Sequence, residues 1–577
     1  MKTVFDGFGT AKKRVILVLS GIIAALPFCF SRLYILSWLF FGVLYTFIFA
    51  QKNGRVTTGS LFCFFYPFYA VLYSWFVNLY PLDFAGLGAF ASVLVIIAAL
   101  TLIPLIHSAV MAFSFLLCAF LTKPKNSVVS SLVFAFSYVF GELLQSVGSF
   151  AFPWGRLFVA QTQRLEIIQS ASLFGSYFIT FLIILVNALA ANALFIKSGI
   201  KVRVFYGAAA LLLFVSNFAY GALKLSDGYD TDGEITVCAL QINMSSEQKW
   251  QSGMTDEALS RFEQLCEKAV NERDRRGQSK IDLFVTPETS FPITLYSGDD
   301  LYSENAKKVD AELKDTAKKY DADVIAGAFY RDNGAYYNSL YLYGRDSSCS
   351  DVYNKQHLVP FGEFLPYRTA LETVFGTAAD LNLFGEDLTA GKMPETAPQT
   401  SNGIKFAGLV CFDSVFPSLC SKQVKNGAKL VIVSTNDSWY KTSAALDQHL
   451  KHSVMRAVEN GVSVVRSANT GISALITPDG RIVKSLGANK YGSITATLPI
   501  SSGTTLYSRT GDIIDESIRQ AELQFMDLPV DKALVDSFIE TIDTFMRSQK
   551  SIVGYSVDLD YDEDLVNEFS QGHIPLV

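Results

Sequence analysis

Three reactive residues lie in the polar half of this 577-residue chain, each at the end of an apolar run. Glu288 lies in TPETSFP, Lys355 in YNKQHLVPFGEF and Cys411 in GLVCFDSVFP. A thiol is a good nucleophile only when a base or a positive neighbour favours its thiolate. A carboxylate can take the thiol proton and return it to a leaving group, and an ammonium can stabilise an oxyanion. These residue types therefore indicate acyl transfer through a thioester.

Each of these residues also has a structural interpretation. A single cysteine is usually a core residue. Glu288 could cap a turn, and Lys355 could be a solvated surface charge. The residue types alone therefore leave the catalytic and the structural interpretations open.

The segments around these residues alternate between strand and helix patterns from Ile235 onward. Strand-like runs are 235–241, 281–286, 323–329, 339–344, 404–411, 429–434, 462–466 and 473–477, and helical patterns include 255–274, 304–320 and 444–460. This alternation predicts an α/β domain with mixed sheets covered by helices, over residues 226–505. The three reactive residues fall where strands end, which is where site residues are commonly found.

The first 225 residues have a different composition. Half of the whole chain is apolar and 46 residues are Phe, and charged residues are scarce between Val15 and Ile196. A transmembrane helix needs about 20 apolar residues. The candidate spans are 15–31, 34–50, 59–80, 86–115, 128–148, 170–196 and 204–222. We therefore predict a polytopic helical membrane domain of about seven spans, with the first span retained rather than cleaved as a signal peptide.

The basic residues of the loops predict the orientation of these spans. Clusters of basic residues precede the first predicted span and follow the second, fourth and sixth, so all of them fall on one side of the membrane. They are Lys12–Arg14, Lys52 and Arg55, Lys123 and Lys125, and Lys197–Arg203. The positive-inside rule places that side in the cytoplasm. Seven spans then deliver the polar domain to the outer side. Splitting the span at 86–115 into two would reverse this arrangement, which the rule disfavours.

Three features of the membrane half admit two interpretations each. Glu142 lies in an apolar helix, where a carboxylate is costly and often functional, but it could lie near the interface or pair with an arginine. Phe152–Trp154 could belong to an aromatic belt or shape a lipid entry. His107 is interpreted as a packing residue.

Composition and spacing exclude other classes of function. No basic tract or basic aromatic face is present, so we expect no nucleic-acid partner. The eight cysteines have no metal-type spacing, and we expect neither a metal nor a cofactor. His449 and His452 are three residues apart on a helical pattern, where helix-surface packing is favoured over metal binding. Arg466 and Asn469 in RSANTG could form a turn that supports the site.

Longer motifs connect the two halves. The chain resembles the apolipoprotein N-acyltransferases, membrane enzymes whose catalytic domain belongs to the nitrilase superfamily. The resemblance extends from the N-terminal spans to about Asp512. The matching segments are FPWGRLFVAQ, QINMSSEQKW, TPETSFP, YNKQHLVPFGEFLP, LVCFDSVFP, STNDSWY and RAVENGVSVVRSANTGISALITPDG.

The resemblance implies roles for particular residues: Glu288 as general base, Lys355 as oxyanion stabiliser and Cys411 as nucleophile. It also implies that Glu363 supports the triad and that Trp250, Asn436 and Trp439 line the site or its mobile loops. The implied fold is an αββα sandwich on the outer face of the bacterial inner membrane. The implied reaction is ping-pong, with a phospholipid as acyl donor and the α-amine of a diacylglyceryl-cysteine apolipoprotein as acceptor. The enzyme is expected to be a monomer.

Two departures from the family pattern are visible. The nucleophile is commonly followed by an aromatic residue and Glu, whereas here Phe412 and Asp413 follow, so the acidic group is on a shorter stem. The family pattern ends in a last transmembrane helix. Here residues 506–577 form an acidic tail, and from Asp512 onward they include 15 acidic and 4 basic residues, which cannot span lipid. A spacing of apolar residues predicts one amphipathic helix there, at Leu534, Phe538, Ile542 and Phe545.

The sequence is also compatible with two other functions, those of an amidase and of a transporter or receptor. A membrane-tethered amidase of the nitrilase type would use the same triad with water as acceptor. The spans favour a lipid acyl donor, and apolar loops such as 291–296 and 364–376 would keep water from a thioester. A transporter or receptor is the non-enzymatic alternative, but no internal repeat of the kind common in transporters is visible.

Overall fold

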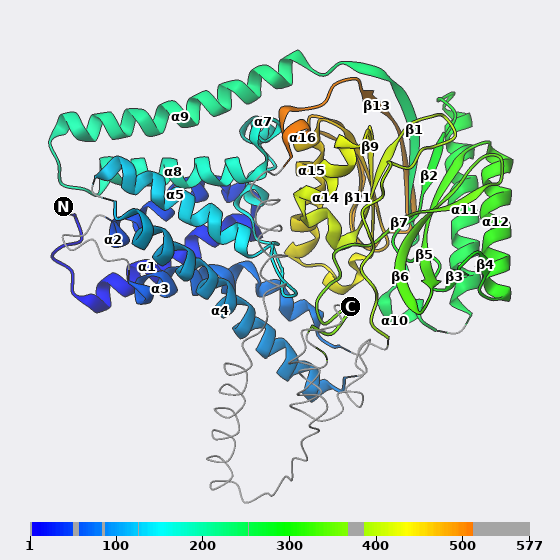
Figure 1. Cartoon of the computed structure of the whole chain (residues 1–577), viewed down its shortest axis with the longest axis horizontal. Coiled ribbons are helices and arrows are strands. Elements are labelled where there is room, and N and C mark those ends of the chain that lie inside the picture. The colour runs from blue at the N-terminus through cyan, green and yellow to red at the C-terminus, as the bar shows by residue number, and fades with distance from the viewer. Residues whose placement is uncertain are drawn as a thin grey trace, which may run out of the picture. The chain divides into compact units, whose positions relative to one another are not determined.

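The apolar first part of the chain folds into long helices, as its composition predicts (Figure 1). The computed structural model describes residues 3–49, 57–82, 87–124, 126–251, 253–366, 368 and 386–511. The long helices are α1 (Thr10–Cys29), α2 (Phe41–Ile48), α3 (Thr58–Leu72), α4 (Ala89–Thr122), α5 (Ser127–Leu144), α8 (Ser176–Leu194) and α9 (Ile200–Asp227). The predicted amphipathic helix of the acidic tail lies outside the described residues, as does most of the predicted apolar loop 364–376.

Shorter helical turns connect these helices. They are η1 (Ser31–Trp38), η2 (Ser74–Leu79), η4 (Leu157–Ala160), α6 (Leu165–Ile168) and α7 (Ala171–Phe174). Because η1 continues into α2 and α3 continues into η2, each pair supplies enough apolar length for one candidate span.

Six helical segments within the described part of the chain are long and apolar enough to cross a membrane. They are Ser31–Ile48, Thr58–Leu79, Ala89–Thr122, Ser127–Leu144, Ser176–Leu194 and Ile200–Asp227. Each coincides with a predicted span. The first predicted span corresponds to α1, which carries Lys12, Lys13 and Arg14 near its start and is not among the six. A seventh crossing by α1 therefore stays a prediction, as does the division of the chain into three domains.

The span predicted at 86–115 is one continuous helix, α4, of 34 residues. Only 17% of its most apolar window is buried inside the protein, which is expected for a helix whose side chains face lipid. His107 is among the buried residues of this helix, and its Nδ1 lies 2.9 Å from the hydroxyl of Tyr73. The interpretation of His107 as a packing residue is therefore confirmed.

The polar part contains two sheets, as the alternating pattern predicts. Among the described residues, eight strands form one sheet: β1 (Thr231–Gln241), β2 (Leu283–Val285), β3 (Thr294–Ser297), β4 (Asp300–Leu301), β5 (Asp323–Asp332), β6 (Ala335–Tyr343), β7 (Cys349–Asn354) and β13 (Gly492–Ser501). The other is β12 (Ile482–Leu486), β11 (Ser473–Ile476), β10 (Ser463–Ala468), β9 (Leu430–Thr435) and β8 (Phe406–Val410), in that order. The neighbours β8, β9 and β10 are parallel, so their carboxyl ends meet at one edge.

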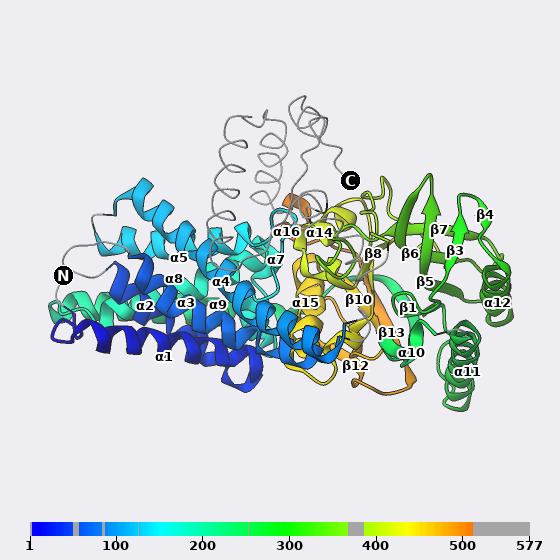
Figure 2. The same cartoon turned by 90° about the horizontal axis from the view of Figure 1, so that it is seen from below.

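Helices cover the outer face of each sheet, which gives the predicted αββα sandwich (Figures 1 and 2). Helices α11 (Met254–Arg275) and α12 (Glu304–Tyr320) share a core with the eight-stranded sheet. A second core, with Val237, Val410 and Ile432, lies between the sheets. Helices α14 (Pro417–Lys425) and α15 (Ala444–Asn460) cover the five-stranded sheet.

The membrane helices and the five-stranded sheet share one continuous apolar core, which passes through α14 and α15. Buried hydrogen bonds cross this core. Trp154 Nε1 donates to Gln448 Oε1 over 2.7 Å, and Gln448 Nε2 donates to the carbonyl of Phe28 over 3.0 Å. Helix α15 is consequently buried along its whole length rather than on one face. This position makes α15 the element that connects the apolar helices to the strand ends.

Candidate active site

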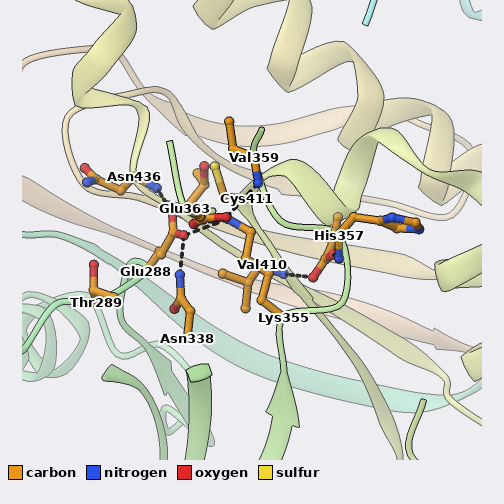
Figure 3. Close-up of polar contacts among 12 residues, drawn as sticks. Glu288, Thr289, Asn338, Lys355, His357, Val359, Glu363, Val410, Cys411 and Asn436 are labelled. Carbon is orange, nitrogen blue, oxygen red and sulfur yellow. Dashed lines mark hydrogen bonds and ion pairs between the residues drawn. The ribbon is translucent and has the colours of Figure 1, made fainter. Parts of the chain in front are cut away.

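Glu288, Lys355 and Cys411 come from both sheets and meet between them (Figure 3). Glu288 follows β2 and Lys355 follows β7 in the eight-stranded sheet, whereas Cys411 directly follows β8 in the five-stranded sheet. All three are buried, at 5%, 1% and 5% exposure respectively. The structure therefore brings together the three residues that the sequence singles out.

Lys355 lies between two carboxylates. Its Nζ is 3.2 Å from Glu288 Oε1 and 2.7 Å from Glu363 Oε1. The second oxygen of Glu363 accepts a hydrogen bond from the backbone N–H of Val359 over 2.9 Å. Glu363 thus orients Lys355, which agrees with the supporting position predicted for it.

Glu288 has a fixed orientation because three hydrogen-bond donors, one of them the ammonium of Lys355, hold its carboxylate. Asn338 Nδ2 donates to Oε1 over 2.7 Å, and the backbone N–H of Asn436 donates to Oε2 over 2.7 Å. Lys355 completes the set on Oε1. Asn436 follows β9 at the same edge as Cys411, so its predicted place at the site is explained by the parallel strands.

Gly327 allows the turn that carries Glu288 to pack closely against the backbone of β5. Gly327 lies on β5, and a Cβ built at this glycine would lie 2.6 Å from the carbonyl oxygen of Pro287 and 2.7 Å from the N–H of Thr289. No side chain fits there, because real Cβ atoms essentially never make such contacts. The glycine therefore lets the turn approach the neighbouring strand.

The nucleophile candidate has an unusual backbone conformation. Cys411 has φ of 50°, in the left-handed region that L-residues rarely adopt. Its carbonyl oxygen accepts a hydrogen bond from Ser414 Oγ over 2.8 Å and lies 3.1 Å from His449 Nε2. Left-handed backbone at such a residue costs about 1–3 kcal/mol and persists only where its surroundings hold it. These contacts to the carbonyl oxygen hold it here.

The environment sets the protonation states of the site. Burial raises the pKa of the Cys411 thiol above its ordinary value, and the neighbouring Glu288 raises it further, whereas Lys355 lowers it. Burial alone would lower the pKa of Lys355, but Glu288 and Glu363 raise it well above its ordinary value. The resting site therefore holds a neutral thiol beside a permanently charged ammonium. Such a thiol needs a base to become nucleophilic.

Asp413 connects the segment of the nucleophile to that of the lysine. It accepts hydrogen bonds from the hydroxyl of Tyr353 over 2.9 Å, from the N–H of His357 over 2.8 Å and from the N–H of Val410 over 3.1 Å. Burial raises its pKa to about 6, against the lowering effects of Lys355 and these hydrogen bonds. The shorter acidic stem that departs from the family pattern thus still reaches both segments.

The aromatic residues predicted to line the site lie in different environments. Phe412 is buried and stacks on Phe152 of the membrane half, with ring centroids 5.7 Å apart and an interplanar angle of 23°. Trp250 is 51% exposed and packs its ring 6.0 Å from that of Phe329. Trp439 is partly exposed on the short helix η7 (Asp437–Tyr440), which directly follows Asn436.

The segment Phe152–Trp154 is part of the interior and not an aromatic belt. Trp154 is fully buried, and its ring lies 5.4 Å from Tyr440 and 5.2 Å from His449. Of the two interpretations of this segment, the aromatic belt is excluded for Trp154 because α15 packs on it, and the lipid entry stays a prediction. The membrane half instead places two aromatic rings next to the segment of the nucleophile.

A buried polar network lies beneath Cys411, and sequence reasoning missed it. His449 Nδ1 lies 2.8 Å from Asp437 Oδ1, and Arg466 Nη2 donates to Asp437 Oδ2 over 2.7 Å. Burial would raise the pKa of Asp437, but Arg466 and His449 lower it below its ordinary value. His449 and His452 are fully buried, so they pack inside the protein and not on an exposed helix face. Arg466 lies on β10 rather than in the expected turn, and Asn469 directly follows this strand. Arg466 contacts Asp437 and Asn469 contacts Asn436, and a supporting role for both stays a prediction.

Asn338 and Lys249 are further contacts of the site that no sequence motif indicated. Asn338 lies on β6 and is 3% exposed, and Lys249 is 2% exposed. A polar residue within a strand pattern gives no signal of its own. In the segment QINMSSEQKW, which contains Lys249, the resemblance implies a role only for Trp250.

Comparisons with known proteins cover both halves of the chain. Residues 20–189 match the model of the apolipoprotein N-acyltransferase N-terminal domain, and residues 236–506 match the model of the carbon-nitrogen hydrolase family. A relative from Bradyrhizobium diazoefficiens, named apolipoprotein N-acyltransferase, is 31% identical over 390 residues, which are 66% of this chain and 70% of that protein.

Two further relatives carry the same name. The protein from Gloeobacter violaceus is 28% identical over 77% of this chain and 80% of its own length. That from Rhodopseudomonas palustris is 29% identical over 70% of this chain and 74% of its own length. In each case the similarity is too long to rest on the catalytic domain alone.

Proposed function

The chain belongs to the apolipoprotein N-acyltransferase family, and from that premise we propose that it transfers an acyl chain through a thioester on Cys411. The acyl donor is a phospholipid, and the acceptor is the α-amine of an N-terminal diacylglyceryl-cysteine of an apolipoprotein. Glu288 is the general base and Lys355 stabilises the oxyanion. The observation that supports this assignment is the convergence of these three buried groups at the ends of strands from two sheets.

The first half-reaction forms the thioester. The carboxylate of Glu288 accepts the proton of the Cys411 thiol, and the sulfur attacks the carbonyl carbon of a phospholipid ester. The negative charge that develops on the carbonyl oxygen faces the ammonium of Lys355. When the tetrahedral intermediate collapses, the carbon–oxygen bond breaks and Glu288 returns its proton to the departing alkoxide. The products are the acyl-enzyme and a lysophospholipid.

The second half-reaction transfers the chain to nitrogen. The neutral α-amine of the acceptor attacks the thioester carbonyl, and Lys355 again faces the oxyanion. The carbon–sulfur bond then breaks. Glu288 takes a proton from the attacking nitrogen and returns it to the sulfur, which restores the thiol and leaves an amide. A single base serves both halves because each begins with a proton to remove and ends with one to return.

Burial of the site favours transfer over hydrolysis. Cys411 is buried, at 5% exposure, and the adjacent Phe412 stacks on Phe152. Exclusion of water slows hydrolysis of a reactive acyl intermediate. The same apolar rings suit a fatty chain.

The location of the protein completes the proposal. The enzyme lies in the bacterial inner membrane as a monomer, and the catalytic domain faces the periplasm. The distribution of lysines and arginines between the loops supports this orientation, with α1 as the first of seven crossings. A periplasm-specific reporter fused after residue 230 is expected to be active, and a cytoplasm-specific reporter at the same position to be inactive. The reverse result would overturn the topology.

The activity is tested by following an acyl chain between two defined molecules. Purified protein in detergent is mixed with phosphatidylethanolamine carrying a labelled acyl chain and with a diacylglyceryl-cysteine peptide. We expect the labelled chain to appear on the peptide as an amide, and Cys411→Ala to abolish this product. Labelled free fatty acid as the sole product would indicate a hydrolase and reject the acyltransferase assignment.

A further inference from the structure

Lys249 is a buried lysine that the mechanism above does not use. It is the last residue of the short helix α10 (Ser246–Lys249) and is 2% exposed, although the next residue, Trp250, is 51% exposed. Lysine is almost never fully buried unless something pairs with it. Its burial next to a catalytic site therefore requires a reason.

The ammonium of Lys249 is directed at the turn that carries the general base. Its Nζ donates to the carbonyl oxygen of Glu288 over 3.1 Å and to the hydroxyl of Thr289. Thr289 has φ of 43°, so the turn is in the left-handed region at a residue that is not glycine. The two hydrogen bonds hold this conformation. Figure 3 shows Thr289 beside Glu288, on the side away from His357.

Both of these acceptors are uncharged, so neither neutralises the ammonium. Burial lowers the pKa of Lys249 to about 8, while Glu288 and Cys411 act in the opposite direction. The titratable groups that face Lys249 are therefore Glu288 and Cys411, and those that face Cys411 include Glu288, Lys355 and Asp437. Since electrostatic coupling is reciprocal, the charge of Lys249 favours a negative charge on each of them.

The charge balance of the site makes this coupling useful. The carboxylates of Glu288 and Glu363 share one ammonium, that of Lys355. Below its pKa, Lys249 supplies a second positive charge, at the turn that carries Glu288. When Glu288 takes the thiol proton, the negative charge moves to sulfur, and Lys249 is electrostatically coupled to both groups. In a buried site such charges act more strongly than in water.

We propose that Lys249 is a positioning residue for the reaction, which holds the Glu288–Thr289 turn through its hydrogen bonds and favours the Cys411 thiolate through its charge. This inference rests on the proposed function, in which Cys411 is the nucleophile and Glu288 its base. It assigns a second active-site cation in addition to Lys355. Lys249 contacts the turn and not the reacting atoms, so its contribution passes through Glu288 and Cys411.

The experiment separates the charge from the hydrogen bonds. Lys249→Met removes both, Lys249→Arg keeps the charge, and Thr289→Val removes only the hydroxyl acceptor. Lys308→Met is the matched control, because Lys308 is an exposed lysine on α12 that pairs with Asp256. All variants are purified at full length in detergent, and their thermal unfolding is recorded. The rate of Cys411 alkylation by iodoacetamide is then measured against pH, in the absence of phospholipid, by mass analysis of the peptide that contains Cys411.

We expect Lys249→Met to slow alkylation about 10-fold at pH 7, where Lys249 still carries its charge, because a nearby opposite charge typically changes a pKa by about one unit. The difference from the wild type should shrink above the pKa of Lys249, about 8. Thioester formation from phospholipid should slow by about 10-fold in the same variant at pH 7. Lys249→Arg and Thr289→Val should each slow alkylation by less than about 3-fold, and Lys308→Met should leave its rate unchanged.

Other results would overturn the inference. An alkylation rate of Lys249→Met at pH 7 equal to that of the wild type does so, as does a loss of rate in Lys249→Arg or Thr289→Val as large as in Lys249→Met. If Lys249→Met does not fold, Lys249→Gln replaces it as the uncharged variant, and the same two outcomes decide. Because alkylation needs no acyl donor, these outcomes are independent of the proposed reaction. That reaction fails separately if wild-type protein forms no thioester.

Discussion

Two buried glutamates, one in each half of the molecule, have similar hydrogen bonds and different surroundings. Glu142 on α5 accepts a hydrogen bond from the N–H of Leu157 over 3.0 Å and from the hydroxyl of Thr180 over 2.9 Å. Glu288 likewise accepts hydrogen bonds from a backbone N–H and a side chain, those of Asn436 and Asn338. Burial and hydrogen bonding therefore do not distinguish a structural carboxylate from a catalytic one.

The neighbours of the two glutamates make the difference. Glu288 has the ammonium of Lys355 on one oxygen and is electrostatically coupled to the thiol of Cys411. Glu142 instead connects α5, η4 and α8, since Leu157 begins η4 and Thr180 lies on α8. A carboxylate in an apolar helix is often functional. Here its contacts indicate that it fixes the start of η4 against α5 and α8.

The largest effect is expected at the catalytic glutamate. Glu288→Gln keeps the size of the side chain but removes the base, so thioester formation should fall by about 10³-fold. One amide position becomes an NH2 group and cannot accept a hydrogen bond, so stability should also fall, by about 1–3 kcal/mol. Single-turnover mass measurements of the acyl-enzyme check this. Activity within 10-fold of the wild type would remove Glu288 from the mechanism.

Lys355→Met should have the next largest effect. Loss of one preorganised group that faces an oxyanion costs about 10²-fold to 10³-fold in rate. The variant also leaves Glu288 and Glu363 buried without their shared cation, so its stability should fall as well. Measuring the rate of each half-reaction separately tests the role, because both oxyanions face the same ammonium. A defect confined to one half-reaction would contradict it.

Glu142→Gln should lower stability to a similar extent as Glu288→Gln but leave the reaction rate nearly unchanged. The amide nitrogen cannot accept from Thr180, so one buried hydrogen bond is lost and the folded state is destabilised by about 1–3 kcal/mol. The rate of thioester formation should stay within about 3-fold of the wild type. Thermal unfolding in detergent and the single-turnover assay are measured on the same preparation. A loss of rate comparable to that of Glu288→Gln, at unchanged stability, would show that Glu142 acts in catalysis.

The smallest effect concerns Asp413 and pH. Burial raises the pKa of Asp413 to about 6, above that of an exposed aspartate. The folded state therefore binds this proton more tightly than the unfolded state. The resulting stabilisation is fully present below about pH 4 and is lost as the pH rises through 6. Asp413→Asn does not titrate, so its midpoint of thermal unfolding should vary less between pH 4 and pH 7 than that of the wild type. Parallel curves for the two proteins would argue against this shift.

Much of the catalytic fold follows from the order of residues in the sequence. Strands such as 231–241 and 463–468 were predicted within a few residues, because alternating and buried apolar runs are local signals. The positions of Glu288, Lys355 and Cys411 at strand ends follow from the same pattern. Their convergence depends on how the two sheets pack on each other, because β2 and β7 belong to one sheet and β8 to the other.

Other parts of the site depend on packing that no local pattern encodes. His449 and His452 are buried because the membrane helices pack on the far side of α15. The sequence of α15 alone does not predict this contact. The stacking of Phe152 on Phe412 joins residues 260 positions apart. The left-handed conformation of Cys411 has no sequence signal either, because the usual indicator of such a turn is glycine.

The central claim is that the acyl chain resides on Cys411, and one measurement tests it most directly. Purified protein is incubated with phosphatidylethanolamine of one defined acyl chain, and its intact mass is determined before and after hydroxylamine. The account predicts an addition equal to one acyl group, located on Cys411, removed by hydroxylamine and absent from Cys411→Ala. An addition of the same size in Cys411→Ala, or on another residue of the wild type, would contradict it.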